Sequence, residues 1–274
     1  MPLTAVAIAL GAAVVHAFWN LVVARARDTQ AVTAVAIAVG VIAAAPFAIL
    51  RWRVEPEAWP FIAASSVLEL VYFWLLTTAY RRAEMSLVYP IARGTAPVIV
   101  LVVSVAALGV ATSLAQAAGV ALVGLGVVLV RGLRTGARWS DVALALAVAV
   151  SIAGYTLVDK EGIRYADPIT YVTLILIAPA IASVAFIYSR GGADRIRAAV
   201  GPATVASGIA TVAAYALVLV ALSMAPAASV AAVREVSVVI AVALGALLLK
   251  ERVGPARVAG AVVVVLGVAL IVTG

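Results

Sequence analysis

Ten apolar stretches, each about the length of a membrane-spanning helix, occupy almost the whole of this 274-residue chain. A helix needs roughly 20 mainly apolar residues to cross a bilayer. The stretches are continuous rather than alternating, which favours helices over the strands of an outer-membrane barrel. The predicted spans are Leu3–Ala24, Ala31–Leu50, Ala58–Tyr80, Ser86–Gly109, Leu114–Val130, Val142–Val158, Pro168–Ser189, Pro202–Ser223, Ala228–Leu249 and Pro255–Val272. Because the connections are short, the function must be carried out within or across the membrane.

The composition excludes several other classes of protein. The chain is 66% hydrophobic and 11% charged, so a water-soluble fold would expose one continuous apolar surface. The net charge of +7 comes from basic residues dispersed over the loops, so we expect no nucleic-acid partner. There is no Cys and one His, and no nucleotide-binding loop, metal-ligand spacing or hydrolase motif is evident. We therefore expect neither an enzyme nor a bound metal or cofactor, and the expected partners are the lipid bilayer and a small molecule.

A polar connection, Arg131–Asp141, divides the chain into five spans and five spans. An odd number of spans per half makes the two halves enter the membrane in opposite directions, as in many transporters. The sequence thus predicts two inverted repeats, 1–135 and 136–274.

A shift of 141 residues aligns the two predicted repeats. It superimposes one intramembrane arginine and two glycines of the first half on identical residues of the second. The matched pairs are Arg93 with Arg234, Gly119 with Gly260, and Gly126 with Gly267. Two Val/Ala/Gly-rich helices could look alike by composition, but three specific matches at one offset favour a true repeat.

The basic residues of the loops predict the orientation in the membrane, because cytoplasmic loops are enriched in Lys and Arg. The odd-numbered loops carry 13 of them and the even-numbered loops four. The odd loops should therefore face the cytoplasm. For a protein of the cell inner membrane, both termini should then be periplasmic.

Several local patterns resemble a known family. The first span carries His16-Ala-Phe-Trp-Asn20, the fourth begins Tyr89-Pro-Ile-Ala-Arg93-Gly, and the ninth contains Arg234-Glu-Val-Ser-Val-Val before Lys250-Glu251-Arg252 and the glycine-containing last span. Together with the five-plus-five repeat, these patterns resemble the ten-helix EamA-type members of the drug/metabolite transporter superfamily. The resemblance implies export or import of small metabolites, including amino acids, without ATP hydrolysis. The family typically has a Glu before the last helix of each half; Glu251 fits, whereas the equivalent residue of the first half is Val110.

Charged residues within the spans are the first candidates for a function, because a charge near the bilayer centre costs about 3 kcal/mol. Arg93, with Tyr89 one turn earlier on the same face, could bind a substrate carboxylate or carbonyl; alternatively, its side chain extends to the interface. Arg234 and Glu235 are adjacent and point in different directions, so each needs a partner elsewhere, and Ser237 shares the face of Arg234. The alternative for this pair is a structural ion pair between helices.

Two carboxyl groups, Glu69 and Glu235, are candidates for proton coupling. Glu69 is a lone acid in mid-span, where hydrocarbon favours the neutral form, so it could take up and release a proton. The alternative is a permanently protonated Glu69 that is hydrogen-bonded to a neighbouring helix. Protons are accordingly the expected coupling ion.

Polar and aromatic residues complete the predicted substrate site. His16, Trp19 and Asn20 share one face of the first span, and Tyr72 lies one turn from Glu69. The alternative for these residues is packing between helices. Trp74, Tyr155, Tyr171 and Tyr215 are further deep aromatics that could line a cavity for varied side chains.

The function predicted from these residues is secondary transport, by alternating access, of a small metabolite, above all an amino acid with a hydrophobic or aromatic side chain. We expect a monomer whose cavity is formed by the first four helices of each half. Spans 5 and 10, rich in small residues and free of internal charge, should pack away from it. The alternatives are a lipid-modifying intramembrane enzyme and a channel or non-transporting scaffold.

Overall fold

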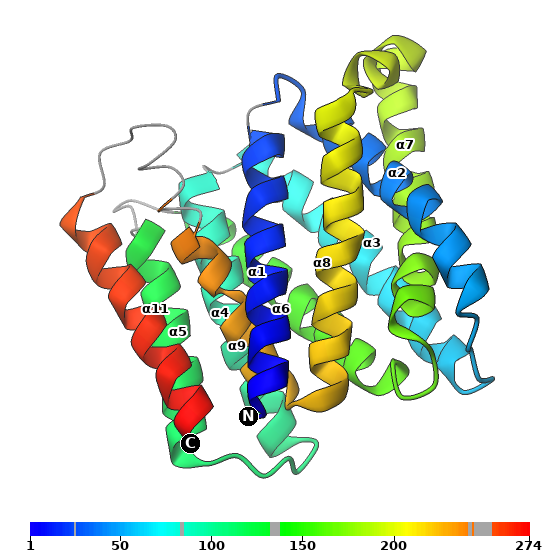
Figure 1. The fold of residues 1–274 in the computed structure, drawn as a ribbon. Coiled ribbons are helices and arrows are strands. Elements are labelled where there is room, and N and C mark those ends of the chain that lie inside the picture. Colours follow the sequence, from blue (N-terminus) through cyan, green and yellow to red (C-terminus); the bar gives the residue numbers. More distant parts are fainter. Residues whose placement is uncertain (25, 83–84, 132–137, 241–242, 244–253) are drawn as a thin grey trace.

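A computed structural model of the protein describes residues 1–24, 26–82, 85–131, 138–240, 243 and 254–274, which are built mainly of α-helices (Figure 1). The first half contains α1 (Leu3–Ala24), α2 (Thr29–Leu50), α3 (Ala58–Arg82), α4 (Met85–Ala106) and α5 (Leu114–Arg131). The second half contains α6 (Trp139–Gly162), α7 (Pro168–Ala199), α8 (Pro202–Met224), α9 (Ala227–Arg234) and α11 (Pro255–Thr273). The predicted all-helical membrane fold is confirmed. Six of the described helices are long and apolar enough to cross a bilayer.

Local sequence explains where several helices begin. Three of them, α7, α8 and α11, start with a proline, whose missing N–H costs nothing in the first helical turn. Asp28 and Asp167 cap α2 and α7: their side chains accept hydrogen bonds from the N–H groups of Ala31 and Ile169. These signals match the predicted spans closely at their N-terminal ends.

The structure corrects three predicted spans. Helix α6 continues four residues past the predicted end at Val158, to Gly162. Helix α7 extends to Ala199 through a kink at Gly192, whose φ of 67° suits a residue without Cβ. In the ninth span, α9 ends at Arg234, Glu235 forms a turn, and residues 236–240 are helical again. Most of the rest of that span, including Glu251, lies outside the described residues.

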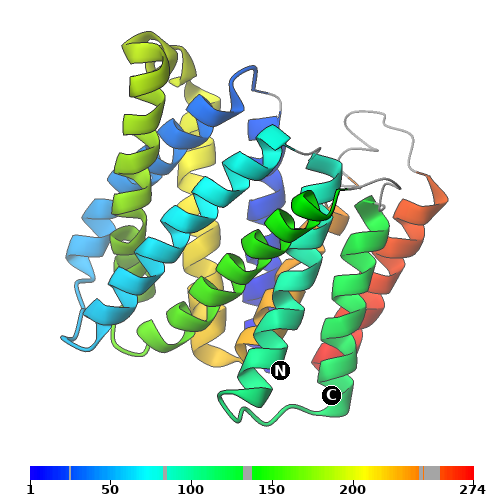
Figure 2. The same cartoon turned by 180° about the vertical axis from the view of Figure 1, so that it is seen from behind.

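Helices α5 and α11 form an antiparallel pair at one edge of the molecule (Figure 1 and Figure 2). Their backbones touch at the repeat-matched glycines. A Cβ added to Gly119 would lie 2.6 Å from the carbonyl oxygen of Gly267, and one added to Gly260 would lie 2.7 Å from that of Gly126. The repeat exchanges these two contacts, because the offset superimposes Gly119 on Gly260 and Gly126 on Gly267, as expected for two halves related by a two-fold axis.

The other helices of the two halves interleave. Helix α1 packs on α8, α2 on α7 and α8, and α3 and α4 on α6. Both termini lie at the end of the bundle where α2 connects to α3 and α6 to α7 (Figure 1). There Val54 and Ala166 form an antiparallel bridge that ties these two connections together. The interleaving brings residues of α1–α4 and α6–α9 around one central space.

Candidate functional site

A cavity of about 120 Å³ lies between the two halves. Helices α1–α4 and α6–α9 all contribute to its wall, and no described residue of α5 or α11 does, as predicted for spans 5 and 10. The lining residues are Ala12, His16, Trp19, Thr33, Ala36, Ile37, Glu69, Tyr72, Phe73, Arg93, Tyr155, Leu176, Thr211, Ala214, Tyr215, Val218 and Arg234.

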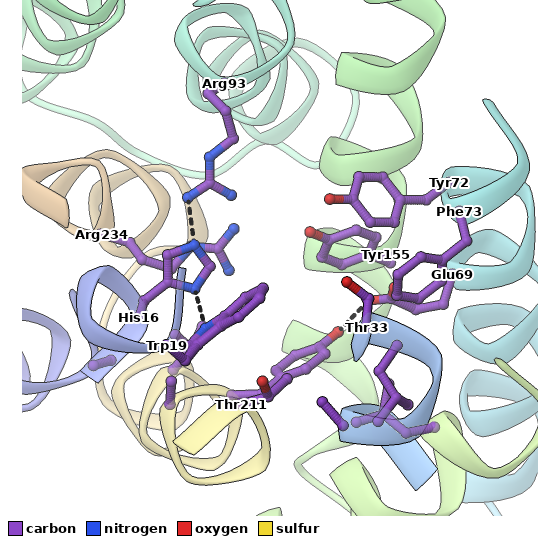
Figure 3. A pocket seen from close by; sticks show the side chains of 17 residues that line it. His16, Trp19, Thr33, Glu69, Tyr72, Phe73, Arg93, Tyr155, Thr211 and Arg234 are labelled. Atoms are coloured by element: carbon purple, nitrogen blue, oxygen red, sulfur yellow. Dashed lines mark hydrogen bonds between the residues drawn. The ribbon is translucent and has the colours of Figure 1, made fainter. Parts of the chain in front are cut away.

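One side of this cavity, the basic wall, is formed by His16, Arg93 and Arg234 (Figure 3). Trp19 Nε1 lies 3.3 Å from His16 Nδ1 and donates to it, and Arg93 Nη2 lies 3.4 Å from His16 Nε2. Indole and guanidinium nitrogens only donate, and a neutral imidazole has a single accepting nitrogen. The basic wall therefore carries positive charge and N–H donors, which suits an anionic group.

The two arginines of the basic wall have different surroundings. Arg93 forms an ion pair with Glu235, with 3.2 Å between Nε and a carboxylate oxygen, and both side chains are buried. Glu235 is not among the residues that line the cavity. Its contact with Arg93 corresponds to the alternative considered above, a structural ion pair between helices. Arg234 is 9% exposed, and among the described residues its Nε has no hydrogen-bond partner. The turn at Glu235 lets these two adjacent residues serve different sites.

The opposite side, the phenol–carboxyl wall, is formed by Glu69, Tyr72, Tyr155 and Tyr215. Figure 3 shows Glu69, Tyr72 and Tyr155 across the cavity from His16 and Arg93. The Tyr215 hydroxyl lies 3.1 Å from Glu69 Oε1. The Tyr155 ring contacts those of Tyr72 and Tyr215, with centroids 6.0 and 6.3 Å apart. This wall offers hydroxyl groups, a carboxyl group and aromatic surface.

The structure therefore brings six predicted site residues to one cavity: His16, Trp19, Glu69, Tyr72, Arg93 and Arg234. Ser237 is 2% exposed but does not line the cavity, because the turn at Glu235 interrupts the helix face that it was expected to share with Arg234. The side chains of Asn20 and Tyr89 lie outside the part of the chain that the structure describes. Trp74 was expected among the cavity aromatics, but it is 65% exposed on the outside of the bundle.

Sequence analysis missed Asp159 as a buried acid. The predicted span ends at Val158, just before the charged triplet Asp159-Lys160-Glu161. In the structure Asp159 is fully buried and accepts hydrogen bonds from Ser65, Tyr171 and Tyr215. Its signal was helical spacing, because it lies one turn beyond Tyr155 on the buried face of α6.

The described residues contain no group of three or more His, Asp or Glu side chains that could hold a metal ion. The walls of the cavity offer arginine, imidazole, phenol and carboxyl groups for binding.

The comparisons with known proteins agree with this architecture. The family model described as the EamA-like transporter family matches residues 3–132 and again residues 139–273. No curated protein is significantly similar in sequence. One solved structure, described only as a crystal structure of a protein, is 18% identical, covers 98% of this chain and 96% of its own, and has a TM-score of 0.80. The same fold therefore occurs in a protein of distant sequence, and the two family matches span both halves. The chain belongs to the EamA-like transporter family.

Proposed function

We propose that this protein is a secondary transporter that exports amino acids, including hydrophobic and aromatic ones, across the inner membrane by alternating access. The observation that carries the proposal is the opposition of the two walls. The basic wall offers Arg234 and its neighbours to a carboxylate, and the phenol–carboxyl wall offers hydrogen-bond acceptors to an ammonium group. A zwitterion satisfies both walls at once, whereas a simple anion or cation satisfies one.

The lining also accommodates a side chain. Tyr72, Phe73 and Trp19 supply aromatic surface, and Leu176 and Val218 supply aliphatic surface. A cavity of about 120 Å³ has room for a small metabolite and lies below the 300–1,000 Å³ typical of drug-sized ligands. Family membership favours transport over a lipid-modifying enzyme, a channel or a scaffold. We propose a monomer as the working unit, protons as the coupling ion, and periplasmic termini.

The experiment is exchange of labelled amino acids in proteoliposomes that contain the purified full chain. A panel of zwitterionic amino acids is compared with matched amines, which lack the carboxylate, and matched carboxylic acids, which lack the ammonium group. We expect exchange of the amino acids and little exchange of either partial analogue. Equal exchange of the amines would contradict carboxylate recognition, and failure of the whole amino-acid panel would overturn the proposed substrate class.

A further inference from the structure

A hydrogen-bonded cluster leads from the cavity into the bundle between α3, α6, α7 and α8. Glu69 lines the cavity, and the Tyr215 hydroxyl lies 3.1 Å from Glu69 Oε1 and 2.6 Å from Asp159 Oδ2. Both carboxyl groups are buried, at 4% and 0% exposure. Tyr215 thus bridges two acids that belong to different halves of the protein.

Asp159 is held by further donors on its other oxygen. Ser65 donates to Oδ1 at 2.6 Å and Tyr171 donates to it at 3.2 Å. Ser65 lies one turn before Glu69 on α3, so one helix face carries the Glu69 carboxyl and contacts that of Asp159. Hydrogen bonds from several donors favour the charged form of a carboxyl group. With three such contacts against one, Asp159 is better placed than Glu69 to hold a negative charge.

Counting hydrogens locates a proton in this cluster. A tyrosine hydroxyl has one hydrogen to donate, and an ionised carboxylate only accepts. Tyr215 can therefore donate to one acid, and its contact with the other is a hydrogen bond only if that acid is protonated. The shorter contact and the two further donors assign the tyrosine hydrogen to Asp159. Glu69 is then the protonated acid, and it donates to the oxygen of Tyr215.

The groups that face Glu69 fit this assignment. They are Tyr72 on its own helix, Tyr155 and Asp159 on α6, Tyr215 on α8 and Arg234 on α9, with His16 and Arg93 across the cavity. Arg234 interacts electrostatically with both acids. It also lines the cavity where a substrate carboxylate is expected. Loss of the Glu69 proton would therefore place Glu69 in competition with the substrate for Arg234, which links the proton to the ligand.

We propose that Glu69, Tyr215 and Asp159 form one proton-binding unit, in which Glu69 carries the coupling proton and Asp159, held by Ser65 and Tyr171, fixes its position through Tyr215. In the transfer step, the Glu69 carboxyl gives its proton to the Tyr215 oxygen while Tyr215 gives its own to Asp159. Glu69 becomes a carboxylate, Tyr215 stays neutral and Asp159 becomes a carboxylic acid. The unit's role in coupling rests on the proposed transport function, but its protonation can be measured without a substrate.

The first test is infrared spectroscopy of the purified full chain at varied pH, which detects the carbonyl stretch of a protonated carboxyl group. We expect such a band at neutral pH in the native protein and its loss in Glu69→Gln. Asp159→Asn removes the negative charge that lies next to Glu69 across Tyr215, so Glu69 should lose its proton more easily and the band should disappear at lower pH than in the native protein. The matched control Glu161→Gln removes an exposed acid two residues from Asp159 and should leave the band unchanged. Absence of the band in the native protein, or its persistence in Glu69→Gln, would overturn the assignment.

The second test separates coupling from transport. Proteoliposomes with Tyr215→Phe are compared with native ones for substrate exchange at equal pH and for uptake driven by a pH gradient. We expect the variant to lose the stimulation of uptake by the gradient, and the exposed Tyr188→Phe control to keep it. Stimulation of normal size in Tyr215→Phe would contradict the proton unit. If native protein exchanges no amino acid, the proposed substrate fails while the infrared result still decides the proton site.

Discussion

Among the two buried arginines at the basic wall, Arg234 is the better candidate for substrate recognition. Its guanidinium lines the cavity, and the neighbouring carboxylate of Glu235 is directed to Arg93 instead. A guanidinium binds a carboxylate with two parallel hydrogen bonds, whereas an ammonium is a point charge. Arg234→Lys should therefore keep the charge and lose the bidentate geometry.

The expected result for Arg234→Lys is an apparent affinity for amino acids weakened about 10- to 100-fold, since one charge-assisted hydrogen bond contributes roughly 1.5–3 kcal/mol. The measurement is concentration-dependent exchange in proteoliposomes. Arg197→Lys, at a side chain that is 79% exposed, is the matched control and should behave like the native protein. Normal affinity in Arg234→Lys would move the carboxylate site to the His16 and Trp19 side of the wall.

The ion pair of Arg93 and Glu235 should matter mainly for stability. Removing one partner of a buried ion pair leaves an uncompensated charge and typically costs about 3–5 kcal/mol. Glu235→Gln should therefore lower the melting temperature of the purified protein, and the double variant Arg93→Gln/Glu235→Gln should recover most of the loss. A double variant that is less stable than Glu235→Gln would contradict this account.

At the scale of residues, the sequence identified charged side chains whose burial in a membrane is energetically costly, but it did not predict which of them pair with each other. Arg93, Arg234 and Glu69 stand out because charge is rare in the spans. The Arg93–Glu235 contact joins α4 to the end of α9, residues far apart in the chain, and depends on a turn that no proline or glycine announces. Asp159 was missed because its burial depends on how α6 packs against α3 and α7.

At the scale of helices, the contact of α5 with α11 depends on glycines. A Cβ at Gly119 would lie 2.6 Å from a backbone oxygen of α11, which cannot rotate away as a side chain can. Gly119→Ala should therefore destabilise the protein by about 1–3 kcal/mol, the usual cost of overpacking. The measurement is thermal unfolding in detergent. Gly11→Ala, in the open face of α1, is the matched control and should be neutral or slightly stabilising. Equal melting temperatures for the two variants would show that α5 and α11 separate easily.

The connection between α1 and α2 is tied to the end of α7. Asp28 caps α2 and also pairs with Arg195, whose Nη2 lies 2.8 Å from Oδ2. Partial burial alone would raise the pKa of Asp28, but the hydrogen bond from the Ala31 N–H and the contact with Arg195 outweigh it and lower this pKa below its usual value. A lowered folded-state pKa stabilises the fold at higher pH, where Asp28 is ionised, and that contribution is lost as the pH falls through the folded pKa.

Asp28→Asn keeps a good helix cap and removes the charge. We expect it to be less stable than the native protein at neutral pH, and the difference to shrink as the pH falls below about 3.9, the ordinary aspartate value, and to vanish below the lowered folded-state pKa. Thermal unfolding at several pH values measures this. Asp194→Asn, which removes a 93% exposed partner of Arg197, should have no effect at any pH. A constant difference for Asp28→Asn across the pH range would contradict the role of its charge.

The helices themselves were predictable because each contains a long continuous apolar stretch. Proline or aspartate marks the start of several of them. Their ends were less predictable. Gly192 kinks α7 rather than ending it, and α6 carries Asp159 inside because Ser65, Tyr171 and Tyr215 compensate that acid. Such compensation comes from other helices and leaves no trace in the local sequence.

At the scale of the whole molecule, the sequence offset superimposes Gly119 on Gly260 and Gly126 on Gly267. The same four glycines lie at the contact between α5 and α11. The reciprocal contacts of these glycines across α5 and α11 are what an inverted repeat produces. The cavity, in contrast, is not symmetric: the acid–tyrosine network occupies one wall and the arginines the other. The repeat thus supplies the frame and the equivalent arginines Arg93 and Arg234, whereas the acid and tyrosines of the opposite wall have no identical residue at the equivalent positions.

The orientation of this frame in the membrane is testable because the native chain has no Cys. The odd loops carry 13 basic residues against four in the even loops, which should hold the odd loops in the cytoplasm. Position 136, between the two halves, lies outside the described residues, so Asp194, at the end where α7 kinks, reports on the cytoplasmic side. Ala111, between α4 and α5, reports on the side of the termini (Figure 1).

In intact cells, a membrane-impermeant maleimide should label Ala111→Cys, and it should label Asp194→Cys only after the membrane is permeabilised. Both residues are exposed, so access to the reagent rather than burial decides the result. The expected pattern follows because moving clustered arginines across the bilayer during insertion is costly. Loops that cross to the periplasm are therefore expected to be poor in Lys and Arg, as the even loops are. The reverse pattern would place the termini in the cytoplasm and the kinked end of α7 outside.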